Sequence, residues 1–122
     1  MKSETPVLQR IRLLVGGIPF VRLFRNQVGL AEYPDGSKVP YGLAKGSSDL
    51  IGWRSIVVTP SMVGRRLAVF VAIEVKSPTG KLEPAQEIFI DNVRQAGGLA
   101  GVAYTEQEAR GIINSLAGAD GI

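Results

Sequence analysis

The spacing of apolar and polar positions predicts helices alternating with strands. Apolar residues recur at helical spacing near the start of the chain and again in two later segments, while shorter apolar runs between them are typical of strands. The expected helices cover residues 3–15, 84–96 and 106–116, and the expected strands cover residues 20–24, 50–59, 66–76 and 99–104. A turn signal at Pro34-Asp35-Gly36 predicts two further short strands around it.

The longest apolar run, Leu67 to Ile73, continues directly into Glu74, Val75 and Lys76. A run of this length, rich in Val and Ile, predicts a strand that is buried on both faces. Because side chains alternate along a strand, Glu74 and Lys76 are expected to point to the same side. An acid and a base at the end of a core strand lie where open sheets build active sites.

Local signals mark where the later helices begin and end. Pro84 suits the first position of a helix, and Gly97 with the next glycine stops that helix. Thr105 and Glu108 match a capping box, which predicts the start of the last helix. The mixed order of elements and the length of 122 residues predict a single α/β domain over residues 1–122.

Composition narrows the chemistry open to this chain. It contains no Cys and no His, which excludes disulfides, zinc-thiolate sites, Ser-His-Asp triads and His-bound metals. An enzyme made from it must use carboxylates, Lys, Tyr, or hard ions such as Mg²⁺ or Mn²⁺ bound through oxygen. The net charge of +3 permits binding to a polyanion. A polar start and short apolar runs predict no signal peptide and no membrane span, which favours a cytoplasmic location.

A set of four side chains suits metal-assisted cleavage of a phosphodiester, which needs a nucleophilic water and neutralisation of charge on the phosphate. Asp49 and Glu74 lie at the ends of two strands expected to be neighbours, and the backbone carbonyl of Val75 is placed to add a metal ligand. Lys76 can position the water or stabilise the developing charge. Gln86, in the first turn of a helix, can hold water or phosphate.

Each of these residues has a plainer interpretation when taken alone. Glu74 and Lys76 are also what a core strand shows where it reaches the surface. Asp49 suits a turn or helix cap, and Gln86 suits the exposed side of a helix. Their order and spacing together favour the catalytic interpretation.

The ordered set resembles the virus-type replication-repair nuclease (VRR-NUC) family of the PD-(D/E)XK nucleases. The resemblance rests on Arg25-Asn26, Gly46 to Ile51, Ile73 to Lys76, Gly80 to Gln86, Phe89, Gly97-Gly98 and Val102 to Tyr104. It implies a restriction-endonuclease-like core, with a mixed central sheet flanked by helices, and DNA cleavage that depends on Mg²⁺ or Mn²⁺. Stand-alone phage members are implied to be homodimers that cut four-way (Holliday) junctions without an organic cofactor.

The chain departs from the family pattern before the catalytic aspartate, where Ser48 replaces the usual proline. This change bears on backbone geometry more than on chemistry. Pro34-Asp35 would match the pattern, but it forms a turn of its own, whereas Asp49 leads directly into an apolar strand. We therefore take Asp49 as the metal ligand. The resemblance also implies an acidic residue on the first helix, for which Glu4 is the candidate.

Several basic and polar residues near these segments are candidates for DNA binding. They are Arg25, Asn26, Lys45 and Lys81. Each of them also has an interpretation without DNA binding, as a residue that ends a strand or lies in a solvated loop. Arg65 and Arg66 are expected at an exposed turn, either solvated or in contact with DNA.

Two other functions stay open at this point. A DNA-binding or assembly module that keeps a nuclease fold would normally lose a metal ligand or the lysine, and here both are present. A nuclease that acts on flaps, duplex ends or RNA would carry the same catalytic residues. Because loops and subunit arrangement decide substrate choice in such folds, these residues do not separate the substrates.

Overall fold

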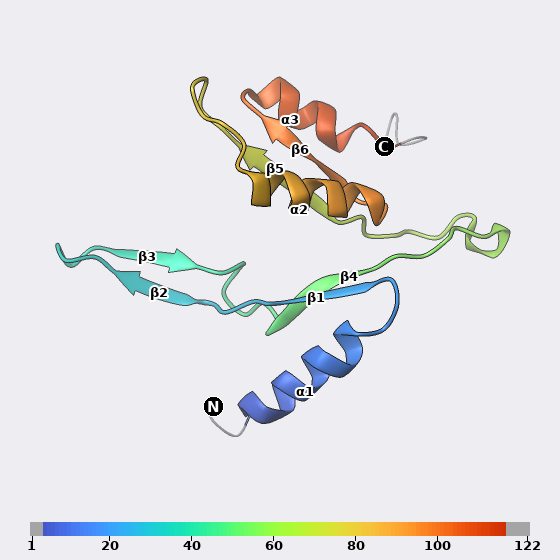
Figure 1. The fold of residues 1–122 in the computed structure, drawn as a ribbon, viewed down its shortest axis with the longest axis horizontal. Coiled ribbons are helices and arrows are strands. Elements are labelled where there is room, and N and C mark those ends of the chain that lie inside the picture. Colours follow the sequence, from blue (N-terminus) through green and yellow to red (C-terminus); the bar gives the residue numbers. More distant parts are fainter. Residues whose placement is uncertain (1–3, 117–122) are drawn as a thin grey trace. The chain divides into compact units, whose positions relative to one another are not determined.

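The structure, a computed structural model, describes residues 4–116. It divides the chain into two compact units, Met1–Ile56 and Val57–Ile122, each of which contains helix and strand (Figure 1). The described strands form three two-stranded sheets, and helices lie before, between and after them in the sequence. The chain therefore has a mixed α/β fold, as the sequence predicts. No helix in the described part is long and apolar enough to cross a membrane.

The first unit packs a helix against an antiparallel strand pair. Helix α1 (Glu4–Gly16) contacts strand β1 (Val21–Arg25), which pairs with β4 (Leu50–Arg54). The rings of Phe24 and Trp53, one from each strand, lie 5.5 Å apart at a tilted angle. Trp53 therefore packs within its own unit, as aromatic neighbours on paired strands commonly do.

A hairpin lies between these two strands in the sequence. Strands β2 (Gly29–Glu32) and β3 (Lys38–Tyr41) pair antiparallel around the predicted turn. The carboxylate of Asp35 accepts hydrogen bonds from the hydroxyl of Ser37 at 2.6 Å and from its backbone N–H at 2.9 Å. These bonds lower the pKa of Asp35 because they stabilise the charged form. Asp35 is thus a turn residue whose carboxylate is used locally.

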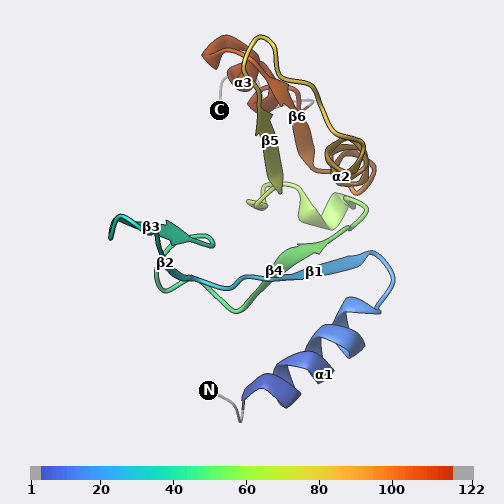
Figure 2. The same cartoon turned by 60° about the vertical axis from the view of Figure 1, so that its left-hand side comes forward.

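The second unit is built on a parallel strand pair. Strand β5 (Val71–Val75) pairs with β6 (Leu99–Ala103), and helix α2 (Pro84–Gln95) forms the crossover that parallel strands require (Figure 2). Helix α3 (Glu106–Ile113) contacts β6. A short 3₁₀ helix, η1 (Pro60–Met62), precedes β5. The buried apolar residues of this unit are Ile90, Val93, Ala100 and Ala103.

Small side chains on β6 allow helices to approach it closely. Both α2 and α3 contact this strand. A Cβ atom at Gly101 would lie 2.9 Å from Cδ1 of Ile112 in α3, so glycine provides the space that this contact needs. Val93 of α2 is only 1% exposed, which makes it the most buried apolar residue described.

The later helices begin and end close to the predicted residues. Gly97, with a φ of 101°, adopts the left-handed conformation just after α2. The hydroxyl of Thr105 accepts the N–H of Glu108 at 3.1 Å. The Glu108 carboxylate in turn accepts the N–H of Tyr104 at 2.6 Å. The predicted capping box is therefore present with its return bond displaced by one residue.

The predicted core strand is shorter and more exposed than its sequence indicates. Strand β5 begins at Val71, because its partner β6 begins at the residue paired with Val71, Leu99. The expectation of burial on both faces is wrong, since no residue of β5 is fully buried and its ends, Val71 and Val75, are 41% and 74% exposed. An apolar run favours a strand, but the length of the partner decides where the ladder stops.

The same reason shortens the predicted strand over residues 50–59. Strand β4 ends at Arg54, which pairs with the first residue of β1, Val21. The residues that follow have no strand partner in the described part of the chain, apart from one bond from the N–H of Ser55 to the carbonyl of Phe20.

Candidate active site

Strand β5 places Glu74 and Lys76 on the same side, as strand alternation predicts. Nζ of Lys76 lies 3.6 Å from Oε2 of Glu74, and both side chains are half-buried. Lys76 directly follows β5, and its N–H still donates to the carbonyl of Ala103 at 3.1 Å. The strand ladder therefore fixes the backbone on both sides of the acid–base pair.

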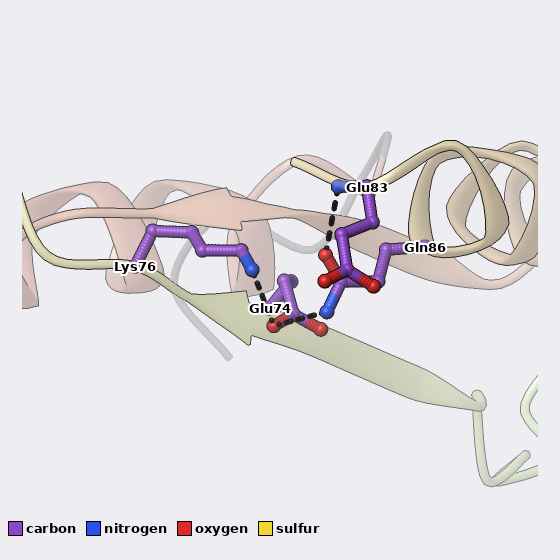
Figure 3. Close-up of polar contacts among 4 residues, drawn as sticks. All are labelled: Glu74, Lys76, Glu83 and Gln86. Carbon is purple, nitrogen blue, oxygen red and sulfur yellow. Dashed lines mark hydrogen bonds and ion pairs between the residues drawn. The ribbon is translucent and has the colours of Figure 1, made fainter. Parts of the chain in front are cut away.

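Gln86 connects this pair to the start of α2 (Figure 3). Nε2 of Gln86 donates to Oε2 of Glu74 at 3.1 Å, and Oε1 of Gln86 accepts the N–H of Glu83 at 3.0 Å. The second bond caps the helix and orients the amide, so that its donor end faces Glu74. The capping role was not predicted, although Gln at the third position after Glu83 is a signal that could have indicated it.

One oxygen of Glu74 takes both of these contacts. Lys76 and Gln86 both contact Oε2, and among the described residues Oε1 makes no hydrogen bond or ion pair. A pocket of about 360 Å³ opens beside Glu74, between β5 and α2. Its lining residues are Ala72, Ile73, Glu74, Ala85, Gln86, Phe89 and Ile90. The carboxylate is thus held in position while one oxygen stays available to a ligand.

The carbonyl of Val75 is a second candidate ligand, because it does not face β6 within the described part of the chain. Between β5 and β6, the N–H of Leu99 donates to the carbonyl of Phe70, and the N–H of Lys76 donates to the carbonyl of Ala103. In a parallel pair, backbone groups alternate between the two edges of a strand, so the even-numbered residues of this strand face β6. The backbone of Val75 therefore faces the opposite edge. An available carboxylate oxygen and an available carbonyl suit a hard divalent ion.

Asp49 directly precedes β4, and its backbone is held by Asn26. The N–H of Asn26 donates to the carbonyl of Asp49 at 2.8 Å. The Asn26 side chain donates to Oγ of Ser47 at 2.7 Å and to the carbonyl of Ser48 at 2.9 Å, and it accepts the N–H of Leu43 at 3.0 Å. One amide thus fixes both ends of the loop that leads into Asp49.

This arrangement explains how the chain does without a proline before Asp49. A proline would stiffen the backbone by restricting its own φ angle. Here the hydrogen bond from Asn26 to the carbonyl of Ser48 restrains the same segment. The sequence predicts Asn26 as a DNA contact and does not indicate this positioning role. Local spacing could not indicate it, because the bonded residues lie 17 to 22 positions apart in the sequence.

The structure brings three of the predicted catalytic residues together in the second unit: Glu74, Lys76 and Gln86. Asp49 belongs to the first unit, and its approach to Glu74 stays a prediction. Within each unit, no three of the described acidic side chains form a group that could hold a metal ion. Glu4 is the first residue of α1, and its side chain lies outside the described part.

The predicted DNA-binding residues are divided between the two units. Arg25, Asn26 and Lys45 lie in the first unit, and Lys81 lies in the second. Arg25, Lys45 and Lys81 are exposed, and none of these three forms an ion pair with another described residue. Their charges are therefore available to an anionic partner.

Comparison with known protein families matches one continuous segment of the chain. The profile of the VRR-NUC domain matches residues 39–107, which is more than half of the chain. The matched segment contains Asp49, Glu74, Lys76 and Gln86, and it begins after the turn that holds Asp35. Comparison with curated proteins and with solved structures gives no match. The chain therefore belongs to the VRR-NUC family and carries a nuclease-type domain.

Proposed function

We propose that this protein is a metal-dependent DNA endonuclease whose site combines Asp49 with Glu74, Lys76 and Gln86. The observation that carries the proposal is the arrangement around Glu74. Lys76 and Gln86 hold Oε2, Oε1 stays available, and a pocket opens beside the carboxylate. A carboxylate fixed in this way is prepared to bind a ligand without first having to be ordered.

The metal ligands in this proposal are the carboxylates of Asp49 and Glu74 and the carbonyl of Val75, with Glu4 as a further candidate. When bound, Mg²⁺ or Mn²⁺ supplies charge neutralisation at the phosphate and a more acidic water. The ammonium group of Lys76 positions the attacking water and stabilises negative charge as it develops. Gln86 keeps the Glu74 side chain in one orientation, since its own amide is fixed by the helix cap.

The proposed fold is the restriction-endonuclease-like core with a mixed central sheet flanked by helices. The two units supply the two kinds of pairing that such a sheet needs. Strands β1 and β4 are antiparallel, and β5 and β6 are parallel with a helical crossover. This core would bring Asp49 and Glu74 to one metal.

The proposed substrate is branched DNA, in particular a four-way junction cut by a homodimer. Resolving a junction requires two cuts, and one chain offers one set of catalytic residues. Arg25, Lys45 and Lys81 are exposed and form no ion pair with another described residue, which supports their contact with phosphates. Contacts of basic side chains with phosphates do not depend on the DNA sequence. A monomer in light scattering, at working concentration with junction DNA present, would contradict the dimer.

Calorimetric titration with Mn²⁺ separates the enzyme from a non-catalytic DNA-binding module. We expect the protein to bind Mn²⁺ and the Glu74→Gln variant to bind it at least about tenfold more weakly, because a charged oxygen ligand is lost. Asp35→Asn removes the same charge from a turn and should bind Mn²⁺ like the parent. A parent protein that binds no Mn²⁺ would favour the module.

Substituting Gln86 separates its two hydrogen bonds. Gln86→Glu keeps an acceptor for the N–H of Glu83 but loses the donor to Glu74 and places two carboxylates side by side. We expect cleavage to fall about 10- to 100-fold, with the helix cap retained and any loss of stability due to repulsion between the two carboxylates. Gln86→Ala loses both bonds and should also cost about 1 kcal/mol of stability. Cleavage rates and urea unfolding of both variants measure this difference.

If Gln86→Glu cleaved DNA at the parental rate, the bond to Glu74 would have no role in orienting the carboxylate. If Gln86→Ala unfolded like the parent, the bond from Gln86 to the N–H of Glu83 would not stabilise the helix cap as the structure indicates.

A further inference from the structure

The loop of residues 59–66, here called the tip, has a shape fixed by its own backbone. The N–H of Met62 donates to the carbonyl of Thr59 at 2.9 Å, and the N–H of Val63 donates to the carbonyl of Pro60 at 3.2 Å. The N–H of Arg65 donates to the carbonyl of Met62 at 3.0 Å. These bonds close the short helix η1 and the turn that follows it. Gly64 adopts a φ of 85°, which other residues rarely do. The tip is therefore a turn of defined shape within the second unit.

The tip exposes an apolar side chain beside two arginines. Val63 is 83% exposed. Arg65 and Arg66 are also exposed, and neither forms an ion pair with any residue between 4 and 116. From Ser55 to Ile73 the sequence contains no Asp or Glu, so nothing local offsets the two positive charges. This combination of charge and shape complements a polyanion that also offers apolar surface.

We propose that the tip binds the DNA substrate: Arg65 and Arg66 contact phosphates, and Val63 packs against bases exposed at the branch point. Arginine suits phosphate because its planar group donates two parallel hydrogen bonds. Proteins that open or bend DNA often insert one apolar side chain between bases and flank it with basic residues. The inference rests on the proposed function, since it takes DNA as the substrate, and it adds residues that contact DNA outside the catalytic set.

Binding is measured in the Glu74→Gln background, so that cleavage does not consume the DNA. Fluorescence anisotropy with a labelled four-way junction and a labelled duplex, over a series of salt concentrations, gives Kd and its salt dependence. Each phosphate contact adds about 0.9 to the slope of log K against log salt. We expect Arg65→Ala/Arg66→Ala to reduce that slope by about 1.8 and to weaken junction binding about tenfold at moderate salt.

A matched control is Arg10→Ala/Arg12→Ala, which removes the same two charges from exposed positions of α1. The control should change the slope and the Kd much less than the tip variant does. Arg65→Lys/Arg66→Lys keeps both charges and should restore most of the slope, which shows that a lost fold is not the cause. Val63→Ser should weaken binding to the junction several-fold and leave duplex binding unchanged, because bases unstack at a branch point and stay stacked inside a duplex.

Equal effects of the tip variant and the α1 control would overturn the proposal, since net charge alone would then explain the loss. Parental binding and slope after Arg65→Ala/Arg66→Ala would also overturn it, while leaving the nuclease assignment intact. If the Glu74→Gln protein bound no DNA at any salt concentration, the proposed function would fail first and the tip proposal with it. The two failures are therefore distinguishable.

Discussion

Replacing Glu74 with Gln is expected to reduce DNA cleavage by on the order of 10³-fold or more while the protein stays folded. The substitution keeps the size of the side chain and an acceptor for Gln86, but it removes the negative charge with which Glu74 would bind a metal ion. Because Glu74 is half-buried and lies at the end of β5, the free energy of unfolding should change little. Single-turnover cleavage and urea unfolding of both proteins give the two quantities.

Lys76→Met extends this prediction to the ammonium group. Methionine keeps much of the apolar stem and removes the charge 3.6 Å from Oε2 of Glu74, so we expect a similar loss of rate. Lys38→Met, at an exposed position of β3, is the matched control and should cleave like the parent. Cleavage at the parental rate by either Glu74→Gln or Lys76→Met would show that the catalytic assignment is wrong.

Asp49→Asn is expected to lower cleavage to a similar extent, whereas Asp35→Asn should leave it unchanged. The two substitutions remove the same charge, and each aspartate belongs to the first unit. Asn26 holds the backbone at Asp49 and the loop before it, while the carboxylate of Asp35 is bound by Ser37. Measuring both variants on the same DNA therefore separates a metal ligand from a turn residue.

The pH dependence of stability gives an independent check on Asp35. Hydrogen bonds from Ser37 lower the pKa of Asp35 in the folded protein. Its contribution to stability is therefore present above the pKa of the unfolded chain and is lost as the pH falls through the folded value. Asp35→Asn should accordingly differ from the parent in its free energy of unfolding at neutral pH and match the parent in acid.

If Asp35→Asn abolished cleavage and Asp49→Asn did not, the choice between the two aspartates would be reversed.

The sequence predicted the helices and the turn better than the strand ends. Helix α2 was readable because Pro84 and Gly97 act locally, within one or two residues of its ends. Strand β5 was predicted too long because its start depends on where β6 begins, and Leu99 lies more than twenty residues further along the chain. Apolar character alone carries no information about the length of a distant partner.

The arrangement of the candidate catalytic residues was also predictable only in part, because some of their contacts are local and others join distant parts of the chain. Strand alternation was enough to place Glu74 and Lys76 on one side, and the structure confirms that they lie together. The double role of Gln86 depends on a bond across 12 positions, and the role of Asn26 depends on bonds across 17 to 22 positions. Such contacts follow from how the elements pack, so no local pattern indicates them.

The most direct measurement is cleavage of labelled four-way junction, flap and linear duplex DNA by the parent protein with Mg²⁺, Mn²⁺ or EDTA. We expect cleavage that requires metal, favours the junction, produces paired cuts and disappears in Glu74→Gln. Equal cleavage of all three DNAs would agree with the proposed catalytic residues and contradict the proposed preference for the junction. Cleavage that persists in EDTA, or no cleavage of any DNA with either metal, would contradict the central claim of a metal-dependent DNA endonuclease.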